Sequence, residues 1–230
     1  MASTVSDRLI EEKRAAAVKA VNLIASGMVV GLGSGSTAAM AIEELGRRMA
    51  TGELRDICGI PTSNASHRLA LEHGIPLVDL ESHPVVDLTI DGADEIDPVR
   101  RVLKGAGGAL LREKIVATRS TRWVIIADST KVVNLIGSRY PVPVEVVKFG
   151  WAGHAEALMA MGADAVRRVE GASAPYITDE GHYIIDARFP RGIEDPERLA
   201  RELRDRPGVV ETGLFLDLNP EVIVGSAALD

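Results

Sequence analysis

The first segment whose residues could do chemistry is "KGAGGALLREK", residues 104–114. Lys104 brings a positive charge. Gly105, Gly107 and Gly108 let the backbone approach a ligand or nearby carboxylates closely, because a glycine has no Cβ. Glu113 follows in an apolar run. A lysine, backbone amides and a glutamate are groups that can move a proton and hold the negative charge that results.

The spacing around Glu113 predicts a helix that begins just after the glycines. Glu113 would share a face with Leu110 and Val116, which lie three positions away on either side. Leu111 and Ile115 would lie opposite, so we expect a helix that is apolar on both faces and buried. Burial raises the pKa of a carboxyl group, so a glutamate here could act as a general base. A glutamate that only pairs with a nearby arginine or lysine fits the pattern equally well.

A second segment, "GLGSGST" at residues 31–37, follows an apolar run and precedes a predicted helix. The first amides of a helix are unpaired and lie at the positive end of the helix dipole. With the hydroxyls of Ser34, Ser36 and Thr37 and the freedom of Gly35, the segment is a candidate phosphate cradle. It matches neither the P-loop nor the dinucleotide-binding glycine pattern. A tight turn that Ser36 caps is the open alternative.

A third segment, "VVDLTIDGADEID" at residues 85–97, is rich in carboxylates. Asp91 should end a strand, and in open α/β sheets ligands bind at the carboxyl ends of the strands. Three interpretations stand: a solvated acidic turn, a calcium loop, or carboxylates directed at sugar hydroxyls. The calcium-loop pattern does not fit. The position at a strand end favours the third for Asp91 and Asp94, and a solvated position stays open for Glu95 and Asp97.

Two further lysines could neutralise a bound anion. Lys131 lies in "ADSTK", just beyond a predicted strand at 122–128 and on the same sheet edge as Asp91. Lys13 lies in the first predicted helix, where periodicity alone does not place it. For any single lysine, a solvated surface position is the more common outcome.

The elements that must position these groups alternate along the first part of the chain. The predicted strands cover residues 28–32, 56–60, 75–79, 85–90 and 122–128, and the predicted helices cover residues 7–25, 36–49, 64–73 and 109–119. Apolar strands without clean alternation, interleaved with helices, predict a mostly parallel sheet that helices cover on both faces. The fold class is therefore α/β, doubly wound and Rossmann-like.

The pattern changes at "YPVPVEVV", residues 140–147, where two prolines mark a boundary. Beyond it we predict a strand at 143–148, a helix at 151–161, a hairpin-like pair in 174–189, a helix at 195–205 and a final strand in "GVVETGLFL". This order is that of a ferredoxin-like α+β unit. The predicted domains are residues 1–140 with 213–230, and a lid at 141–212. Two short apolar runs in the last residues could rejoin the first sheet.

Composition excludes several classes of protein. The net charge of −7 argues against a nucleic-acid surface, which needs a basic stripe. No apolar run is long enough for a transmembrane helix, and the N-terminus resembles no signal peptide. Cys58 is the only cysteine, so we expect a reducing compartment and a buried structural thiol. The five histidines show no metal-ligand spacing.

In this order, "GLGSGSTAAM", "DGADEID", "KGAGGALLREK" and "ADSTK" resemble ribose-5-phosphate isomerase of the A type. The resemblance covers nearly the whole chain, including "PVEV" at 143–146 and "GVVETGLF" at 208–215. It implies a doubly wound domain with a small α+β lid. It also implies a cytoplasmic homodimer or homotetramer of the pentose phosphate pathway, with a phosphosugar substrate, no metal or other cofactor, and no nucleic-acid or membrane partner.

The resemblance also implies roles for the candidate residues in interconverting ribose 5-phosphate and ribulose 5-phosphate. Glu113 would move a proton between C1 and C2 through a cis-enediolate, and Asp91 would assist ring opening. Asp94 and Lys104 would lie near the developing oxyanion. The residues that would bind the substrate and its phosphate are Ser34, Gly35, Ser36, Thr37, Lys13, Lys131, Gly105, Gly107 and Gly108.

Two positions depart from the familiar pattern. Ser34 stands where threonine is common, which keeps the hydroxyl. Residues 105–109 read G-A-G-G-A where G-G-G-A-A is familiar, which changes the positions that have backbone freedom and so the amides that would face a substrate.

Three rival functions remain for comparison. An aminosugar-phosphate isomerase or deaminase would need a histidine for ring opening, and the carboxylate segments contain none. A sugar-phosphate sensor normally accompanies a DNA-binding module, for which this chain has no room. A CoA transferase would need other residues around "LLREK" than those in this chain.

Overall fold

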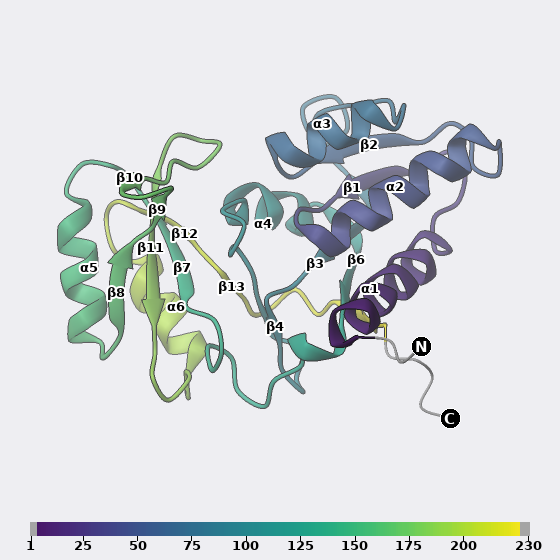
Figure 1. Ribbon diagram of the computed structural model, residues 1–230. Helices are drawn as coiled ribbons and strands as arrows, with labels where there is room; N and C mark the ends of the chain where they lie inside the picture. The colour runs from purple at the N-terminus through teal and green to yellow at the C-terminus, as the bar shows by residue number, and fades with distance from the viewer. Residues whose placement is uncertain (1–3, 226–230) are drawn as a thin grey trace. The chain divides into compact units, whose positions relative to one another are not determined.

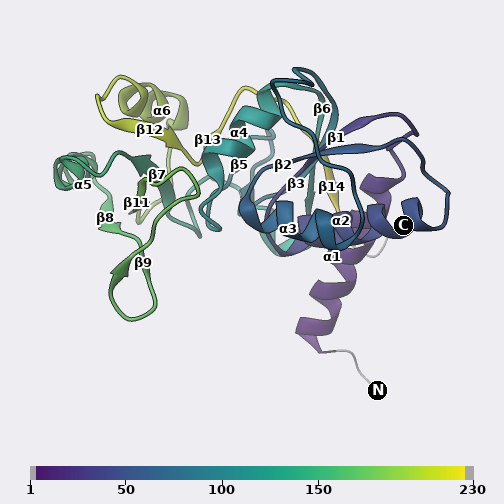
Figure 2. The same ribbon diagram turned by 90° about the horizontal axis from the view of Figure 1, so that it is seen from above.

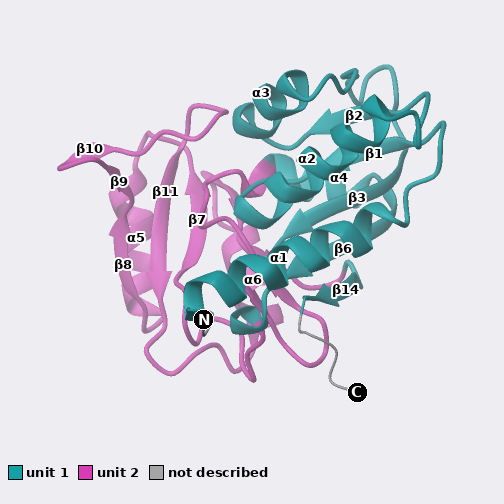
Figure 3. Cartoon of the chain, turned by 45° about the vertical axis from the view of Figure 1, so that its right-hand side comes forward, with its two compact units in different colours: residues 1–93, 112–131, 218–230 teal, residues 94–111, 132–217 magenta. Residues whose placement is uncertain are grey.

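The computed structural model describes residues 4–225 of the chain (Figure 1). The chain divides into two compact units (Figure 3). Among the described residues, the first consists of residues 4–93, 112–131 and 218–225, and the second of residues 94–111 and 132–217. Within residues 4–225, no helix has the length and apolar character that crossing a membrane requires.

The first unit is built on a parallel sheet, as the sequence predicts. Its five strands follow the order β14-β6-β3-β1-β2, and every neighbouring pair is parallel. The strands are β1 (Val29–Leu32), β2 (Cys58–Pro61), β3 (Val86–Gly92), β6 (Ser120–Ala127) and β14 (Glu221–Val224). Parallel strands that lie between helix layers are apolar on both faces, which is why their residues do not alternate.

Helices cover both faces of this sheet. They are α1 (Val5–Val21), α2 (Ser36–Ala50), α3 (Asn64–Glu72) and α4 (Leu110–Thr118), and a short 3-10 helix, η1 (Ser129–Lys131), follows β6. Figure 2 shows α1, α2 and α3 on one side and α4 on the other. The larger core cluster joins α1, α2 and α3 to one face, and Val116 of α4 packs against Ile60 and Val86 on the opposite face. The structure therefore confirms the doubly wound α/β fold.

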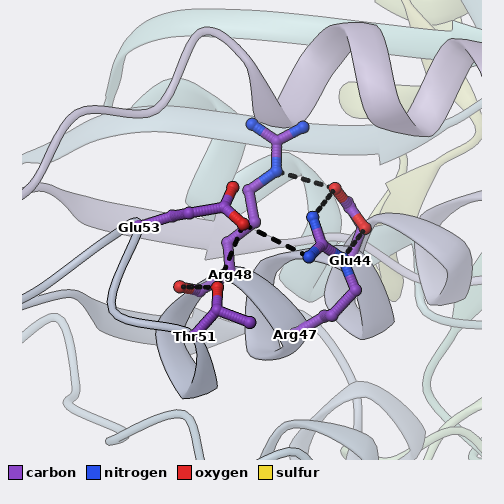
Figure 4. Close-up of polar contacts among 5 residues, drawn as sticks. All are labelled: Glu44, Arg47, Arg48, Thr51 and Glu53. Atoms are coloured by element: carbon purple, nitrogen blue, oxygen red, sulfur yellow. Dashed lines mark hydrogen bonds and ion pairs between the residues drawn. The ribbon is translucent and has the colours of Figure 1, made fainter.

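Ion pairs secure the C-terminal end of α2 (Figure 4). Glu44 accepts hydrogen bonds from Arg47 Nε at 2.8 Å and Arg48 Nε at 2.7 Å. The bond from Arg47 lowers the pKa of Glu44 to about 2. Arg47 also pairs with Glu53 at 3.3 Å, and Thr51 donates to the same carboxylate at 3.0 Å. Cations in a last turn also face the negative end of the helix dipole. These ion pairs and hydrogen bonds stabilise the C-terminal end of α2, and the helix begins at Ser36.

The second unit contains the predicted ferredoxin-like arrangement. Its antiparallel sheet has the order β12-β7-β11-β8, and α5 and α6 join the strands in β-α-β-β-α-β order. The elements are β7 (Val142–Val146), α5 (Trp151–Ala160), β8 (Asp164–Arg167), β11 (Tyr183–Arg188), α6 (Pro196–Arg204) and β12 (Val209–Thr212). One core cluster joins the sheet to both helices, through Leu158 and Leu203 among others.

Short strands complete the second unit. They are β4 (Glu95–Ile96), β5 (Val102–Leu103), β9 (Val169–Glu170), β10 (Ala174–Pro175) and β13 (Leu214–Phe215). β13, β5 and β4 form one small antiparallel sheet, and β9 pairs with β10. These pairings place the segment 94–111 in the second unit, whereas the division from sequence keeps it with the first domain. The predicted domain limits stay a prediction.

Several sequence predictions of detail are wrong. The predicted strand at 75–79 is a single bridge between Leu77 and Gly59. The hairpin-like pair in 174–189 does not form, because β10 pairs with β9, whereas β11 pairs with β7 and β8. Of the two C-terminal runs, β14 rejoins the parallel sheet, but β13 belongs to the second unit. Cys58 is half-buried, not buried.

Candidate active site

The hydroxyl-rich turn between β1 and α2 packs directly against the end of β3. A Cβ on Gly33 would lie 2.3 Å from Asp91 Oδ1 and 2.5 Å from its Cα, so only glycine allows this approach. Asp91 is fully buried, and its Oδ1 accepts hydrogen bonds from the amides of Ser34 at 3.1 Å and Gly92 at 2.8 Å. The turn and the carboxylate therefore hold one another in place.

The hydroxyls of this turn have different surroundings. Ser34 Oγ donates to Ser63 Oγ at 2.8 Å and lies 2.8 Å from Thr62 Oγ1, so it organises the turn in this structure. Thr37 is buried, whereas Ser36 is exposed at the start of α2. Gly35 precedes the helix with a φ of 93°, a conformation that favours glycine. The exposed start of α2, with its unpaired amides, is the part of the turn that can receive an anion.

Lys13 joins the start of α2 to the end of β6. Its Nζ donates to Ser36 Oγ at 3.1 Å and lies 3.9 Å from Asp128 Oδ2. The structure thus resolves what periodicity could not: Lys13 points from α1 to the carboxyl edge of the sheet. A cation, a hydroxyl and a helix N-terminus meet there, which is the chemistry of a phosphate site.

Lys131 lies in η1, directly after β6, and Asp128 organises this turn. Asp128 Oδ1 accepts from the amide and the hydroxyl of Thr130, and the Lys131 amide donates to Asp128 O at 3.1 Å. Buried Glu12 of α1 accepts from the Ser129 amide at 2.8 Å, and this bond lowers the pKa of Glu12. The predicted location of Lys131, at the carboxyl edge of the sheet, is confirmed.

Glu113 is buried in α4, with 4% of its surface exposed. The predicted face is confirmed, since Leu110, Val116 and Ala117 are buried with it. The prediction of a helix buried on both faces is wrong, because Ile115 on the opposite side is 44% exposed. The helix covers the sheet with one face only, and Glu113 is the carboxylate on that face.

The second unit holds Asp94 and the glycine loop, which we define as residues 105–108. Asp94 Oδ2 accepts a hydrogen bond from the Ala106 amide at 2.8 Å. Gly105 and Gly108 have φ values of 96° and 82°, whereas Gly107 has neither a positive φ nor an atom within 4 Å of its added Cβ. The loop therefore needs glycine at its first and last positions, and Ala106 fits between them without strain.

Lys104 is 3% exposed and enters the glycine loop from β5. Its amide donates to Gly213 O at 3.0 Å, and its Nζ lies 5.8 Å from the centroid of the Phe215 ring. A Cβ on Gly213 would lie 2.3 Å from Lys104 O, so the two segments approach closely. A buried ammonium group is costly unless negative charge accompanies it.

The solvated positions left open for Glu95 and Asp97 are wrong. Glu95 is fully buried and accepts hydrogen bonds at 2.6 Å from the amides of Gly137, Arg139 and Tyr140. Asp97 is buried and pairs with Arg101 Nε at 2.6 Å. Both carboxylates tie loops of the second unit together and are not free for a substrate.

The candidate residues are thus divided between the units. The first unit holds Lys13, Ser34, Gly35, Ser36, Thr37, Asp91, Glu113 and Lys131, and the second holds Asp94, Lys104, Gly105, Gly107 and Gly108. Sequence reasoning missed Thr62 and Ser63, which bind Ser34. They come just after the predicted strand at 56–60, so the sequence could have placed them at the carboxyl edge of the sheet.

Comparisons with known proteins identify the family of the chain. The family described as "Ribose 5-phosphate isomerase A (phosphoriboisomerase A)" matches residues 58–228. Ribose-5-phosphate isomerase A of Gluconobacter oxydans is 51% identical over 216 residues, 93% of this chain and 92% of the relative. The enzyme of Thermococcus kodakarensis is 44% identical over 217 residues, 94% of each chain.

Solved structures of ribose-5-phosphate isomerases also match the chain. A D-ribose-5-phosphate isomerase in complex with phospho-erythronic acid superposes with a TM-score of 0.92 at 42% identity, covering 95% of this chain and 96% of the other. Ribose 5-phosphate isomerase A of Methanocaldococcus jannaschii gives a TM-score of 0.87 at 41% identity, covering 94% of each chain. The chain therefore belongs to the ribose-5-phosphate isomerase A family and is an isomerase of ribose 5-phosphate.

Proposed function

We propose that the chain interconverts D-ribose 5-phosphate and D-ribulose 5-phosphate through a cis-enediolate, with Glu113 as the general base. The observation that carries this proposal is the burial of Glu113 on the sheet-facing side of α4. A carboxylate removed from water accepts a proton more readily. It would take the proton from C2 of the open-chain aldose and return it to C1, while the proton of the C2 hydroxyl passes to the oxygen on C1, so that the reaction has no net proton change.

Lys104 is assigned to the negative charge that forms when the C2 proton leaves, and Asp94 to a position near it. The buried Lys104 ammonium would stabilise the enediolate oxygen electrostatically. Asp94 is oriented by the Ala106 amide, so it has a fixed relation to the glycine loop. A fixed ammonium group and fixed loop amides stabilise a transition state without having to reorganise during the reaction.

Asp91 is assigned to ring opening. One oxygen of its carboxylate is fixed by the amides of Ser34 and Gly92, which also fixes the direction of the other oxygen. An oriented carboxylate could take the proton of the C1 hydroxyl and pass it to the ring oxygen as the bond between C1 and the ring oxygen breaks, so that ring opening needs no net proton. The aldehyde that this produces is the form from which the C2 proton can be removed.

The phosphate is assigned to the start of α2, with the lysines beside it. Ser36 and Thr37 begin the helix after Ser34 and Gly35, and Lys13 contacts Ser36 directly. Lys131 lies at the same edge of the sheet, after β6. The positive end of the helix dipole and two ammonium groups would offset the unfavourable net charge of the protein for an anionic ligand.

The resemblance to the family supports further parts of the proposal. The enzyme would act in the non-oxidative branch of the pentose phosphate pathway, in the cytoplasm, as a homodimer or homotetramer and without a metal. Activity should therefore survive exhaustive EDTA treatment, and a loss that added metal restores would contradict it. Light scattering during gel filtration would give the oligomeric state.

The direct test is to incubate the purified protein with ribose 5-phosphate and follow ketose formation. Glu113→Gln keeps the shape of the side chain but removes its basicity, so kcat should fall by about 10²- to 10⁴-fold. The exposed Glu43 provides the matched control, Glu43→Gln. Near wild-type turnover of Glu113→Gln would show that Glu113 is not the base.

Binding should be largely spared in the same variant. Phospho-erythronic acid, which a solved relative holds, carries a phosphate and a planar carboxylate whose two oxygens resemble those of an enediolate. It should inhibit the wild type competitively and still bind Glu113→Gln, as calorimetry would measure.

A further inference from the structure

Two side chains hold three consecutive carbonyl groups of the glycine loop. Arg168 Nη1 donates to Gly105 O and to Ala106 O, at 3.0 Å in each case. Tyr176 Oη donates to Gly107 O at 3.2 Å. All these residues belong to the second unit, although Arg168 and Tyr176 are far from the loop in sequence.

Arg168 is itself held by Asp186 of β11. Its Nε and Nη2 donate to the two carboxylate oxygens at 2.9 and 2.5 Å. Because the guanidinium is planar, this two-point contact also fixes the direction of Nη1. The Tyr176 amide donates to Arg168 O at 3.0 Å, and the guanidinium carbon lies 5.6 Å from the tyrosine ring centroid. The two donors therefore form one preorganised group.

Fixing the carbonyl groups also fixes the amides of the loop. In a trans peptide the C=O of one residue and the N–H of the next point in opposite directions. The Ala106 amide is directed to Asp94 Oδ2 at 2.8 Å, and the Gly108 amide to Gly105 O at 2.9 Å. The Gly107 amide finds no acceptor within the described residues 4–225. The Gly107 amide, which lies between those of Ala106 and Gly108, is therefore the loop amide that can donate to a ligand.

Tyr176 also explains why residue 108 is a glycine. A Cβ on Gly108 would lie 2.1 Å from Tyr176 Oη, and Gly108 has a φ of 82°. The hydroxyl therefore packs onto the backbone of the loop itself. No side chain could be added there without displacing the donor to Gly107 O.

We propose that Arg168 and Tyr176 are positioning residues for the isomerisation. They hold the glycine loop so that the Gly107 amide and the Asp94 carboxylate keep their orientation while charge develops on the enediolate. This inference rests on the proposed function, because it assigns the loop to the reacting end of the sugar. The phosphate is assigned to the first unit, so loosening the loop should affect the chemical step more than binding.

The test compares conservative variants with neighbours of the same residue type. Tyr176→Phe removes only the hydroxyl, and Arg168→Lys keeps the charge but loses the two-point contact with Asp186. Tyr183→Phe and Arg167→Lys are the controls. Arg167 stacks on Trp151 and Tyr183, with its guanidinium carbon 4.6 and 5.1 Å from the two ring centroids.

The expected result is a separation of kcat from KM. Misplaced groups at a reacting centre can cost up to about 10²-fold in rate. We therefore expect kcat to fall by about 3- to 10-fold in Tyr176→Phe and by about 10- to 100-fold in Arg168→Lys, with little change in KM. Affinity for phospho-erythronic acid should fall in parallel with kcat, while affinity for inorganic phosphate stays constant. The control variants should match the wild type in all these measurements.

The outcomes distinguish this inference from the proposed function. A wild type that does not isomerise ribose 5-phosphate overturns both. An active wild type whose kcat is changed no more by Tyr176→Phe and Arg168→Lys than by the controls overturns the positioning role alone. A rise in KM at constant kcat also overturns it, because the loop would then act in binding. Tyr176→Phe alters a single exposed hydrogen bond, so at least one variant should fold.

Discussion

Replacing Lys13 by methionine should raise the KM for ribose 5-phosphate by about 10- to 100-fold. The Lys13 ammonium lies 3.1 Å from Ser36 Oγ at the start of α2, and its side chain is 23% exposed. Hydrogen bonds to charged groups contribute about 1.5–3 kcal/mol. Each 1.4 kcal/mol or so is a factor of ten in affinity, which gives the expected range. Methionine keeps the length and the apolar part of the chain and removes the charge.

The phosphate does not react, so Lys13 should bind the ground state and the transition state equally. Loss of such uniform binding raises KM and leaves kcat nearly unchanged. Initial rates of ketose formation over a range of ribose 5-phosphate concentrations would give both constants. D-ribose, which has no phosphate, serves as the second substrate. Its kcat/KM should be the same in the wild type and in Lys13→Met.

Lys19→Met is the matched control, since Lys19 is an exposed lysine in the last turn of the same helix. It should change neither constant for either substrate. An unchanged KM for ribose 5-phosphate in Lys13→Met would show that Lys13 does not bind the phosphate. An equal fall in kcat/KM for D-ribose and for ribose 5-phosphate would show that Lys13 acts through the fold.

Two further predictions concern Lys131 and Glu44. Lys131→Ala should raise KM for ribose 5-phosphate, and an unchanged value would remove Lys131 from the phosphate site. Glu44 has its pKa lowered to about 2 in the folded protein, from about 4.5. Its stabilising effect is therefore present above about pH 4.5 and is lost as the pH falls toward 2. Denaturant unfolding should show Glu44→Gln less stable by about 1 kcal/mol at pH 7, after allowance for solvent screening of its ion pairs, and by less at pH 3. Glu43→Gln, at the exposed neighbouring position, is the matched control.

The architecture of both units could be predicted because it depends on local patterns. Apolar runs such as 122–128, separated by helical periodicity, predict a parallel sheet with helices on both faces. The predicted strand at 75–79 failed because an apolar run also suits an extended loop, and here a single bridge at Leu77 was formed. The hairpin predicted in 174–189 does not form, because strand pairing depends on partners that are distant in sequence. β11 pairs with β7 and β8 instead.

The sequence by itself determined the fold class, the family and the residue types that can perform the reaction. Helical spacing also predicted that Glu113 shares a buried face with Leu110 and Val116, but not that the opposite face is exposed. These conclusions depend on order and spacing along the chain, which need no coordinates.

Only the tertiary structure decided how these groups are held. In the folded chain Lys13 donates to Ser36, and the buried Glu95 carboxylate accepts from three backbone amides. Arg168 and Tyr176 donate to carbonyl groups of the glycine loop. The physical reason is that a hydrogen bond requires two groups within about 3 Å at a suitable angle. Residues far apart in sequence reach such a geometry only when the whole chain has packed.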